Sequence, residues 1–174
     1  AMGRYDEAEP YYREALKTSR RVLGDDHPST LTFLSNMGLL LESTGRLDEA
    51  EKYSREAVEA SRRVLGNEHP ETLSSIHNLG RLLDESDRLD EAEPYYREAL
   101  EKSRRVLGDD HPSTLIRISS FGRMLDKLGH SEEAQPYYRE AMETGRRVLG
   151  DEHPYTIIYI HNMASILREM NQLD

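Results

Sequence analysis

The feature that most constrains the fold is an internal repeat of 42 residues. Four related segments, GRYDEAEPYYREAL, GRLDEAEKYSREAV, DRLDEAEPYYREAL and GHSEEAQPYYREAM, begin at Gly3, Gly45, Asp87 and Gly129. A fixed period of this length indicates an array of like units, each burying its apolar face against its neighbours. We therefore predict one array over residues 3–174, with units 3–44, 45–86, 87–128 and 129–170 and the start of a fifth at 171. We give Ala1 and Met2 no weight, because they could be left from cloning.

Each unit contains two predicted helices. The first, near Tyr5–Leu23, opens with acidic residues and closes with Arg20 and Arg21, which match the helix dipole at both ends. Gly24 ends it, and the second helix, near Pro28–Thr44, begins with proline in its favoured first-turn place. Apolar residues recur at three- and four-residue spacing, and no β-type alternation occurs. The expected fold is all-α, an α-solenoid of eight helices in antiparallel hairpins.

Composition narrows the classes of function. The chain has 174 residues and a formal net charge of −10 at pH 7, which disfavours nucleic acid and anionic membranes as partners. It has no cysteine, so neither a disulfide nor a thiol nucleophile is available. No apolar run approaches the ~18 residues of a membrane span, and the chain does not open with a signal peptide. We expect a soluble, cytoplasmic protein.

The stretch VLGDDHPSTL at Val22 recurs in every unit and places His27, His69, His111 and His153 at equivalent positions. Packed helices lie ~8–10 Å apart, whereas the ligands of one zinc ion must each come within ~2.1 Å of it. Four equivalent histidines therefore cannot share one metal. A site that combines His27 with Asp25 and Asp26 is the alternative. We favour a structural role, in which each histidine holds or caps the start of the next helix, and we expect no cofactor.

The other chemical motifs also repeat, whereas an enzyme needs one unique constellation of residues. The sequence has no glycine-rich phosphate loop, and we expect no catalysis. We interpret the arginine pairs at 20–21, 62–63, 104–105 and 146–147 as solvated helix ends paired with nearby acids. We interpret the tyrosine pairs at 11–12, 95–96 and 137–138 as packing between helices.

The sequence pattern of each unit resembles that of the tetratricopeptide repeat. It consists of a small residue, the pair LL, and then Gly-x-x-(D/E)-E-A-E-x-x-Y-x-x-A-(L/M/V). The 42-residue period with VLG…HP resembles the kinesin light chain type of that repeat, and the resemblance covers residues 3–174. It implies a right-handed superhelix with a concave groove. In the naming used for this repeat, helices of the Pro28–Thr44 type are helix A and helices of the Tyr5–Leu23 type are helix B. The A helices then line the groove.

Divergence between units gathers in helix A. By register the groove-facing rows are Ser35, His77, Ser119 and His161; Asn36, Asn78, Ser120 and Asn162; Leu39, Arg81, Arg123 and Ser165; and Glu42, Asp84, Asp126 and Arg168. The asparagine row matches the position where the resembling repeats hold a peptide backbone, since an amide both donates and accepts hydrogen bonds. Ser120 departs from that pattern. The alternative is that these asparagines bond to helix A itself or to water.

Arg81 and Arg123 occupy the third of these rows. They would favour an acidic or C-terminal carboxylate ligand, unless neighbouring acids such as Asp84, Glu85 and Asp126 pair with them first.

These observations lead to two hypotheses on function. The first is a protein-interaction module that binds an extended peptide, with about three residues per unit and roughly ten to twelve in all. The second is head-to-tail self-association. The chain starts on a helix B and stops inside the next one, so we expect apolar edges at both ends and a fragment of a longer protein. An enzyme is the third and least favoured interpretation.

Overall fold

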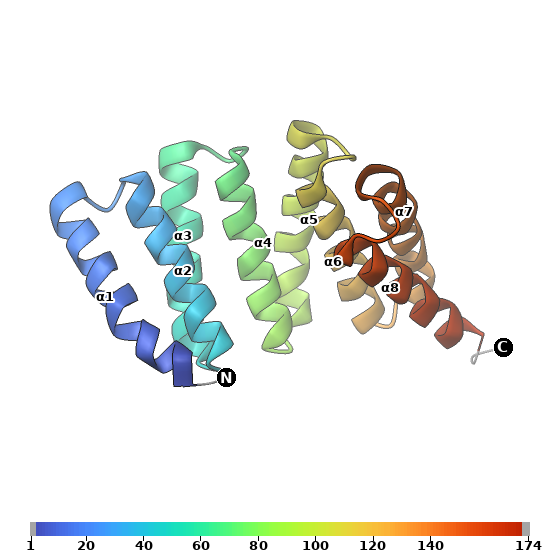
Figure 1. Cartoon of the computed structure of the whole chain (residues 1–174), viewed down its shortest axis with the longest axis horizontal. Coiled ribbons are helices and arrows are strands. Elements are labelled where there is room, and N and C mark those ends of the chain that lie inside the picture. Colours follow the sequence, from blue (N-terminus) through green and yellow to red (C-terminus); the bar gives the residue numbers. More distant parts are fainter. Residues whose placement is uncertain (1–2, 172–174) are drawn as a thin grey trace. The chain divides into compact units, whose positions relative to one another are not determined.

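The computed structural model describes residues 3–171, which form eight helices and no strand (Figure 1). The helices are α1 Gly3–Leu23, α2 Pro28–Ser43, α3 Leu47–Leu65, α4 Pro70–Glu85, α5 Leu89–Leu107, α6 Pro112–Lys127, α7 Ser131–Leu149 and α8 Pro154–Met170. The predicted helices are therefore confirmed, with bounds that differ by a few residues. Most of the predicted fifth copy, residues 172–174, and the first two residues lie outside the described part.

The chain divides into two compact units, one up to Arg88 and one from Leu89. Within the first unit α1 packs on α2, α2 on α3 and α3 on α4, and the second unit repeats this order from α5 to α8. Helices of type A also touch directly, α2 against α4 and α6 against α8. Each unit thus has the stacked helix hairpins of an α-solenoid, with the A helices side by side. The single array over residues 3–174 stays a prediction.

Each helix A begins at the histidine of the His-Pro element. The Nδ1 atoms of His27, His69, His111 and His153 accept hydrogen bonds from the backbone N–H two residues further on, at 3.1–3.2 Å. The preceding helix B ends at a glycine such as Gly24, whose φ of +91° is in the region that favours glycine. The structural interpretation of this element is confirmed, because its histidine is a helix N-cap.

Small residues set the closest approach of neighbouring helices. A Cβ atom added to Gly38 would lie 2.7 Å from the Ser54 hydroxyl, and one added to Gly122 would lie 3.1 Å from Cβ of Tyr137. Larger side chains fill the space on either side. In the first unit Leu31 and Leu34 of α2 cluster with alanines of α3, and in the second unit Phe121 is buried. Glycine at these two positions therefore allows the neighbouring helix to approach closely.

The tyrosine pairs do not all pack between helices. The second members of two pairs, Tyr96 and Tyr138, are 1% and 3% exposed, as the packing interpretation predicts. Tyr11 is 74% exposed, so for this residue the prediction was wrong. The reason is positional, because no helix in the described part of the chain precedes α1 and covers that face.

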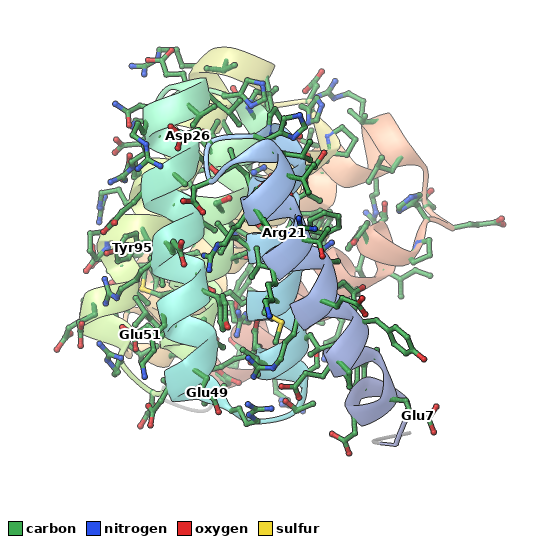
Figure 2. The ribbon with its side chains drawn as sticks, turned by 90° about the vertical axis from the view of Figure 1, so that its left-hand side faces the viewer. Glu7, Arg21, Asp26, Glu49, Glu51 and Tyr95 are labelled. Carbon is green, nitrogen blue, oxygen red and sulfur yellow. The ribbon has the colours of Figure 1, made fainter. Side chains whose placement is uncertain are left out.

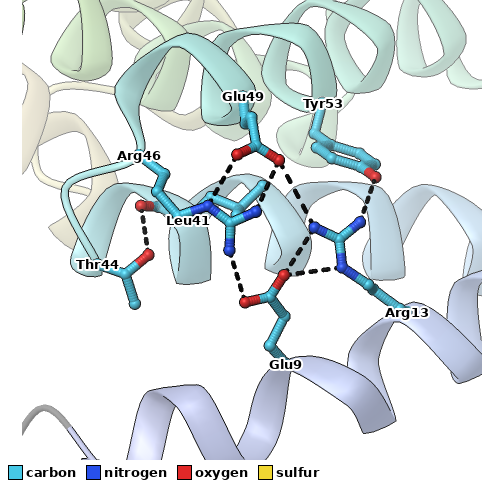
Figure 3. Close-up of polar contacts among 7 residues, drawn as sticks. All are labelled: Glu9, Arg13, Leu41, Thr44, Arg46, Glu49 and Tyr53. Atoms are coloured by element: carbon cyan, nitrogen blue, oxygen red, sulfur yellow. Dashed lines mark hydrogen bonds and ion pairs between the residues drawn. The ribbon is translucent and has the colours of Figure 1, made fainter.

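Ion pairs link helix B of one repeat to helix B of the next. Arg46, just before α3, donates to Glu9 of α1 at 2.7 Å and to Glu49 of α3 at 2.7 and 2.8 Å (Figure 3). Arg13 joins the same network through Glu9 and the Tyr53 hydroxyl. The hydrogen bond from Arg46 is the main reason that the pKa of Glu9 lies below its usual value. This network therefore holds α1 and α3 side by side.

In each recurring arginine pair at least one arginine contacts an acid, as predicted. Arg20 contacts Glu56 and Arg104 contacts Glu140, in each case on the helix B of the following repeat. Arg63 and Arg147 contact Asp26 and Asp110 in the preceding His-Pro loops. Figure 2 shows Asp26 near the end of α1 and Glu49 near the start of α3, at the opposite end of these two helices. These arginines are therefore part of the surface pairing between helices.

Candidate functional site

The first unit has a hollow between its two A helices. Its volume is about 220 Å³, and it is lined mainly by hydroxyl, amide and apolar side chains of α2 and α4. Three predicted site residues meet there: Ser35 and Asn36 come from α2, and Asn78 comes from α4. All three are half-buried. The structure thus brings together both asparagines of the first unit's row, with Ser35 of the adjacent row beside them.

The serines of α4 in this hollow are already engaged with their own helix. Ser74 donates to the carbonyl of Pro70 at 3.0 Å, and Ser75 donates to the carbonyl of Glu71 at 3.1 Å. Hydrogen bonds of this kind hold a hydroxyl against its own backbone. The amides of Asn36 and Asn78 are therefore the groups in the hollow best suited to both donate to and accept from a ligand.

The first predicted row is less accessible than the asparagine row. His77 and Ser119 are each only 8% exposed, whereas Ser35 is half-buried and His161 is exposed. His77 and Ser119 therefore offer little surface to a ligand. Sequence periodicity places all four residues on one face of helix A, but neighbouring helices cover two of them.

In the second unit the asparagine row is arranged differently. Asn162 of α8 donates from Nδ2 to the hydroxyl of Ser119 on α6, at 3.1 Å. Ser120 is half-buried and offers a hydroxyl where the first unit has an amide. The Oδ1 atom of Asn162 is not used in that bond. This arrangement resembles the alternative of internally bonded asparagines, although the partner lies on the neighbouring A helix.

Arg81 is paired within the protein. It contacts the carboxylate of Glu42 on α2, with one bond of 2.7 Å to Oε2, and that of Glu85 at 3.0 Å. Burial raises the pKa of Glu42 to about 7, opposed by the charge of Arg81 and reinforced by Glu85. In the second unit Arg123 donates to the Tyr96 hydroxyl at 3.4 Å. Arg81, in the third groove-facing row, is therefore not a free positive charge.

A second hollow, of about 560 Å³, lies between α1 and α2. It is lined by Tyr5, Ala8, Tyr12, Asn36, Leu39, Leu40 and Ser43. Sequence reasoning missed it, because the apolar stripe of α1 was assigned to packing. The 42-residue repeat was the signal that could have revealed this hollow. It relates Ala8 to Ala50, which is fully buried in the first unit, whereas Ala8 is only half-buried.

Residues 3–171 contain no group of three or more histidine, aspartate and glutamate side chains placed to hold a metal ion. Nor does any helix in this range combine the length and apolar character needed to cross a membrane.

The stacked hairpins define an α-helical repeat protein, and comparison with known proteins gives the family. The family model for the tetratricopeptide repeat matches residues 1–62, 29–103, 85–144 and 131–174. The chain therefore belongs to the tetratricopeptide repeat family. No curated protein matches it.

Solved structures with a similar fold include repeats named as those of a kinesin light chain. One is the crystal structure of the nearly identical TPR-like repeats of a putative kinesin light chain from Podosopora anserina. This chain shares 23% sequence identity with it. The match covers 98% of this chain and 81% of that one, with a TM-score of 0.83. A form of those repeats with a single glutamine-to-methionine change has a TM-score of 0.84, at 23% identity and 98% and 80% coverage. BtubC (BKLC) from P. vanneervenii has a TM-score of 0.87, at 22% identity and 98% and 68% coverage. These likenesses show a shared fold.

Proposed function

We propose that this chain is a non-catalytic protein-interaction scaffold that binds an extended peptide along its helix A faces. Tetratricopeptide repeats generally bind proteins or peptides, and the family is generally non-catalytic. The observation that carries the finer proposal is the hollow between α2 and α4, where Asn36 and Asn78 line one surface from two helices. A cytoplasmic location is part of the proposal and rests on composition alone.

The chemistry of the hollow suits a peptide backbone. An amide side chain can accept from a backbone N–H and donate to a backbone carbonyl, as a neighbouring strand does. Leu39, which is half-buried, adds apolar surface beside the amides. This combination supports capture of an extended segment largely independently of its side chains.

Charge contributes less to the proposal. The expectation of an acidic ligand rested on Arg81 and Arg123, and Arg81 is bound by Glu42 and Glu85. That pairing removes the support that Arg81 gave to an acidic ligand. We therefore propose that affinity in the first unit comes from the backbone contacts.

The test compares asparagines that differ only in position. Peptides are selected from a random display library against the whole chain, and the best is measured by calorimetry. N36A together with N78A should weaken binding at least tenfold and leave Tm nearly unchanged. N67A is the matched control, because Asn67 is exposed in a His-Pro loop. The double change N78A and N162A separately tests whether both units contribute.

The outcomes separate the levels of the proposal. Unaltered affinity in the N36A/N78A variant would rule out the asparagine contacts. Failure to select any peptide that binds the chain would remove the peptide-binding function itself.

A second candidate function is self-association, favoured by exposed apolar side chains on α8. Ile157, Ile158 and Leu167 are 56%, 48% and 40% exposed. Light scattering tests it directly, because the average mass should rise with concentration. A constant monomer mass up to high concentration would contradict it.

A further inference from the structure

The hollow between α2 and α4 differs in chemistry from one end to the other. Toward the middle of the two helices, Asn36 and Asn78 present amides, which both donate and accept hydrogen bonds. Nearer the first turns of the helices the lining includes Thr32 of α2 and Glu71 of α4. Both of these residues are exposed, so a ligand in the hollow can reach their side chains.

The side chains of Thr32 and Glu71 can accept hydrogen bonds from a ligand but cannot donate them. The hydroxyl of Thr32 donates to the carbonyl of Pro28 at 3.1 Å, which leaves its oxygen as an acceptor. An ionised carboxylate only accepts, and that of Glu71 takes part in no ion pair within residues 3–171. We call the part of the hollow lined by Thr32 and Glu71 its acceptor end.

The charge of the surrounding helices also favours a positive ligand group. Among the described residues Glu71 is the only charged one that lines the hollow. Over their whole length α2 and α4 carry four acidic residues, Glu42, Glu71, Asp84 and Glu85, against the single arginine Arg81. The pair therefore stays negative even when Glu42 is protonated. A cation is attracted to a concave surface of this sign.

The second unit has different groups at the same repeat positions. Ile116 and Tyr155 stand where the first unit has Thr32 and Glu71. The charge balance of the A helices is also reversed, because α6 and α8 carry more basic than acidic residues: Arg117, Arg123, Lys127 and Arg168 against Asp126 and Glu169. The acceptor end is therefore a feature of the first unit and not of the repeat.

The size of the hollow suits one side chain. Its volume of about 220 Å³ lies below the range of about 300–1,000 Å³ that is usual for pockets of drug-sized ligands. Arginine and lysine combine a positive charge with donors only. Their apolar stems can lie along half-buried Leu39, and the planar guanidinium has enough donors to reach α2 and α4 at once.

We propose that this hollow binds a basic side chain of the captured peptide, with arginine preferred, and that Glu71 determines this specificity. The charged group lies at the acceptor end, between Thr32 and Glu71, while the backbone of the same segment lies on Asn36 and Asn78. The proposal rests on the proposed function and adds selectivity to the backbone capture. The segment held by the first unit is therefore basic.

The composition of selected peptides gives the first test. Random twelve-residue peptides are displayed and selected against the whole chain. We expect the selected peptides to share an arginine or lysine at one fixed position. Citrulline has nearly the shape of arginine without its charge, so replacing that arginine by citrulline should weaken binding about tenfold by calorimetry. For a selected lysine, acetyl-lysine is the neutral form.

A double-mutant cycle locates the side chain. E71Q should weaken the arginine peptide about tenfold and the citrulline peptide less than about twofold, because both changes remove the same contact. E59Q is the matched control, since Glu59 is an exposed acid of α3 that does not line the hollow. It should change either affinity less than about twofold. Thermal unfolding checks that both variants are folded.

The outcomes separate the inference from the proposed function. Failure to select any peptide would remove peptide binding and this inference with it. Peptides that lose affinity in the N36A/N78A variant but share no basic residue, or that tolerate citrulline, would overturn the basic specificity and leave backbone capture in place. Additive losses from E71Q and citrulline would show that the arginine binds elsewhere, which would overturn the role of Glu71.

Nuclear magnetic resonance gives a measurement that needs no selected peptide. N-acetylarginine amide, titrated into the whole chain, should shift the side-chain amide resonances of Asn36 and Asn78. N-acetylcitrulline amide should not shift them, and E71Q should remove the effect of the arginine compound. Equal shifts from the two compounds, or shifts that survive in E71Q, would contradict a cation site beside Glu71.

Discussion

The two units have nearly the same B helices and the same histidine caps, yet their A faces differ. In the first unit Asn36 and Asn78 line one hollow between α2 and α4. In the second, Asn162 of α8 is bonded to Ser119 of α6. Residues that occupy one row of the repeat therefore have different surroundings in the two units. The repeated part positions the helices, and the divergent part decides which polar groups each pair of A helices exposes.

A buried acid is one electrostatic difference between the units. Glu42 of the first unit is nearly buried beside Arg81, whereas its counterpart Asp126 is half-buried and accepts a hydrogen bond from the Ser131 hydroxyl. The pKa of Glu42 is raised to about 7 from an ordinary value of 4.5. The contribution of Glu42 to the free energy of unfolding of the first unit is therefore greatest below pH 4.5, and it is lost as the pH rises through 7.

This difference gives the largest predicted effect. We expect the free energy of unfolding of wild type to fall by about 3 kcal/mol between pH 4.5 and pH 8 relative to the E42Q variant, which cannot ionise there. Urea titrations at each pH measure the loss, and hydrogen exchange locates it in residues 3–88. D126N is the control in the second unit. Parallel pH profiles for E42Q and wild type would contradict the prediction.

Two of the three helix A glycines, Gly38 and Gly122, give the next effect. We expect G122A to lower the free energy of unfolding by about 1 kcal/mol, because the new methyl group meets Cβ and the ring of neighbouring tyrosines. G38A should be close to neutral, since the Ser54 hydroxyl can rotate away and alanine favours the helix. Urea unfolding of both variants checks the difference. A larger loss for G38A than for G122A would reverse this interpretation.

The junction between helix A and helix B also differs. Arg46 bridges Glu9 and Glu49 in the first unit, whereas the second has His130, 3.7 Å from Glu133. We expect R46A to lower Tm by on the order of 2 °C at pH 7, and H130A to change it less. The pKa values of Glu9 and Glu49 are lowered chiefly by Arg46, so the effect of R46A should shrink as the pH falls below 4. An R46A effect that persists at pH 3 would count against these ion pairs.

The smallest effect concerns the turn before helix B. Asp87 has a φ of +59°, whereas the equivalent Gly45 and Gly129 have φ values of +77° and +81°. A side chain is strained in this region, but glycine adds freedom to the unfolded chain. We therefore expect D87G to raise the free energy of unfolding by only about 0.5 kcal/mol, and G129D to lower it by a similar amount. Urea midpoints compare the two, and a destabilising D87G would show that the Asp87 side chain stabilises its turn.

Much of the fold was predictable because its signals are local. Proline after histidine, glycine after leucine and charges at helix ends each act within one turn of the chain. The approximate helix bounds, the caps of His27 and His69 and the contacts of Arg20 and Arg63 with acids followed from them. The candidate site was less predictable. Register identified Asn36 and Asn78 as one row, but the burial of His77 and the bond from Asn162 to Ser119 depend on packing between helices.

By itself, the sequence determined the repeat, its two helices, their caps and the family. These features depend on periodicity and on the backbone preferences of residues that lie close together in the chain. Only the tertiary structure decided which members of a row are accessible. It paired Arg81 with Glu42, which lies 39 residues earlier in the chain. It also left Ile157 exposed while its counterparts are buried. The physical reason is the same in each case: whether a side chain binds a neighbour, a ligand or water depends on the surface packed against it.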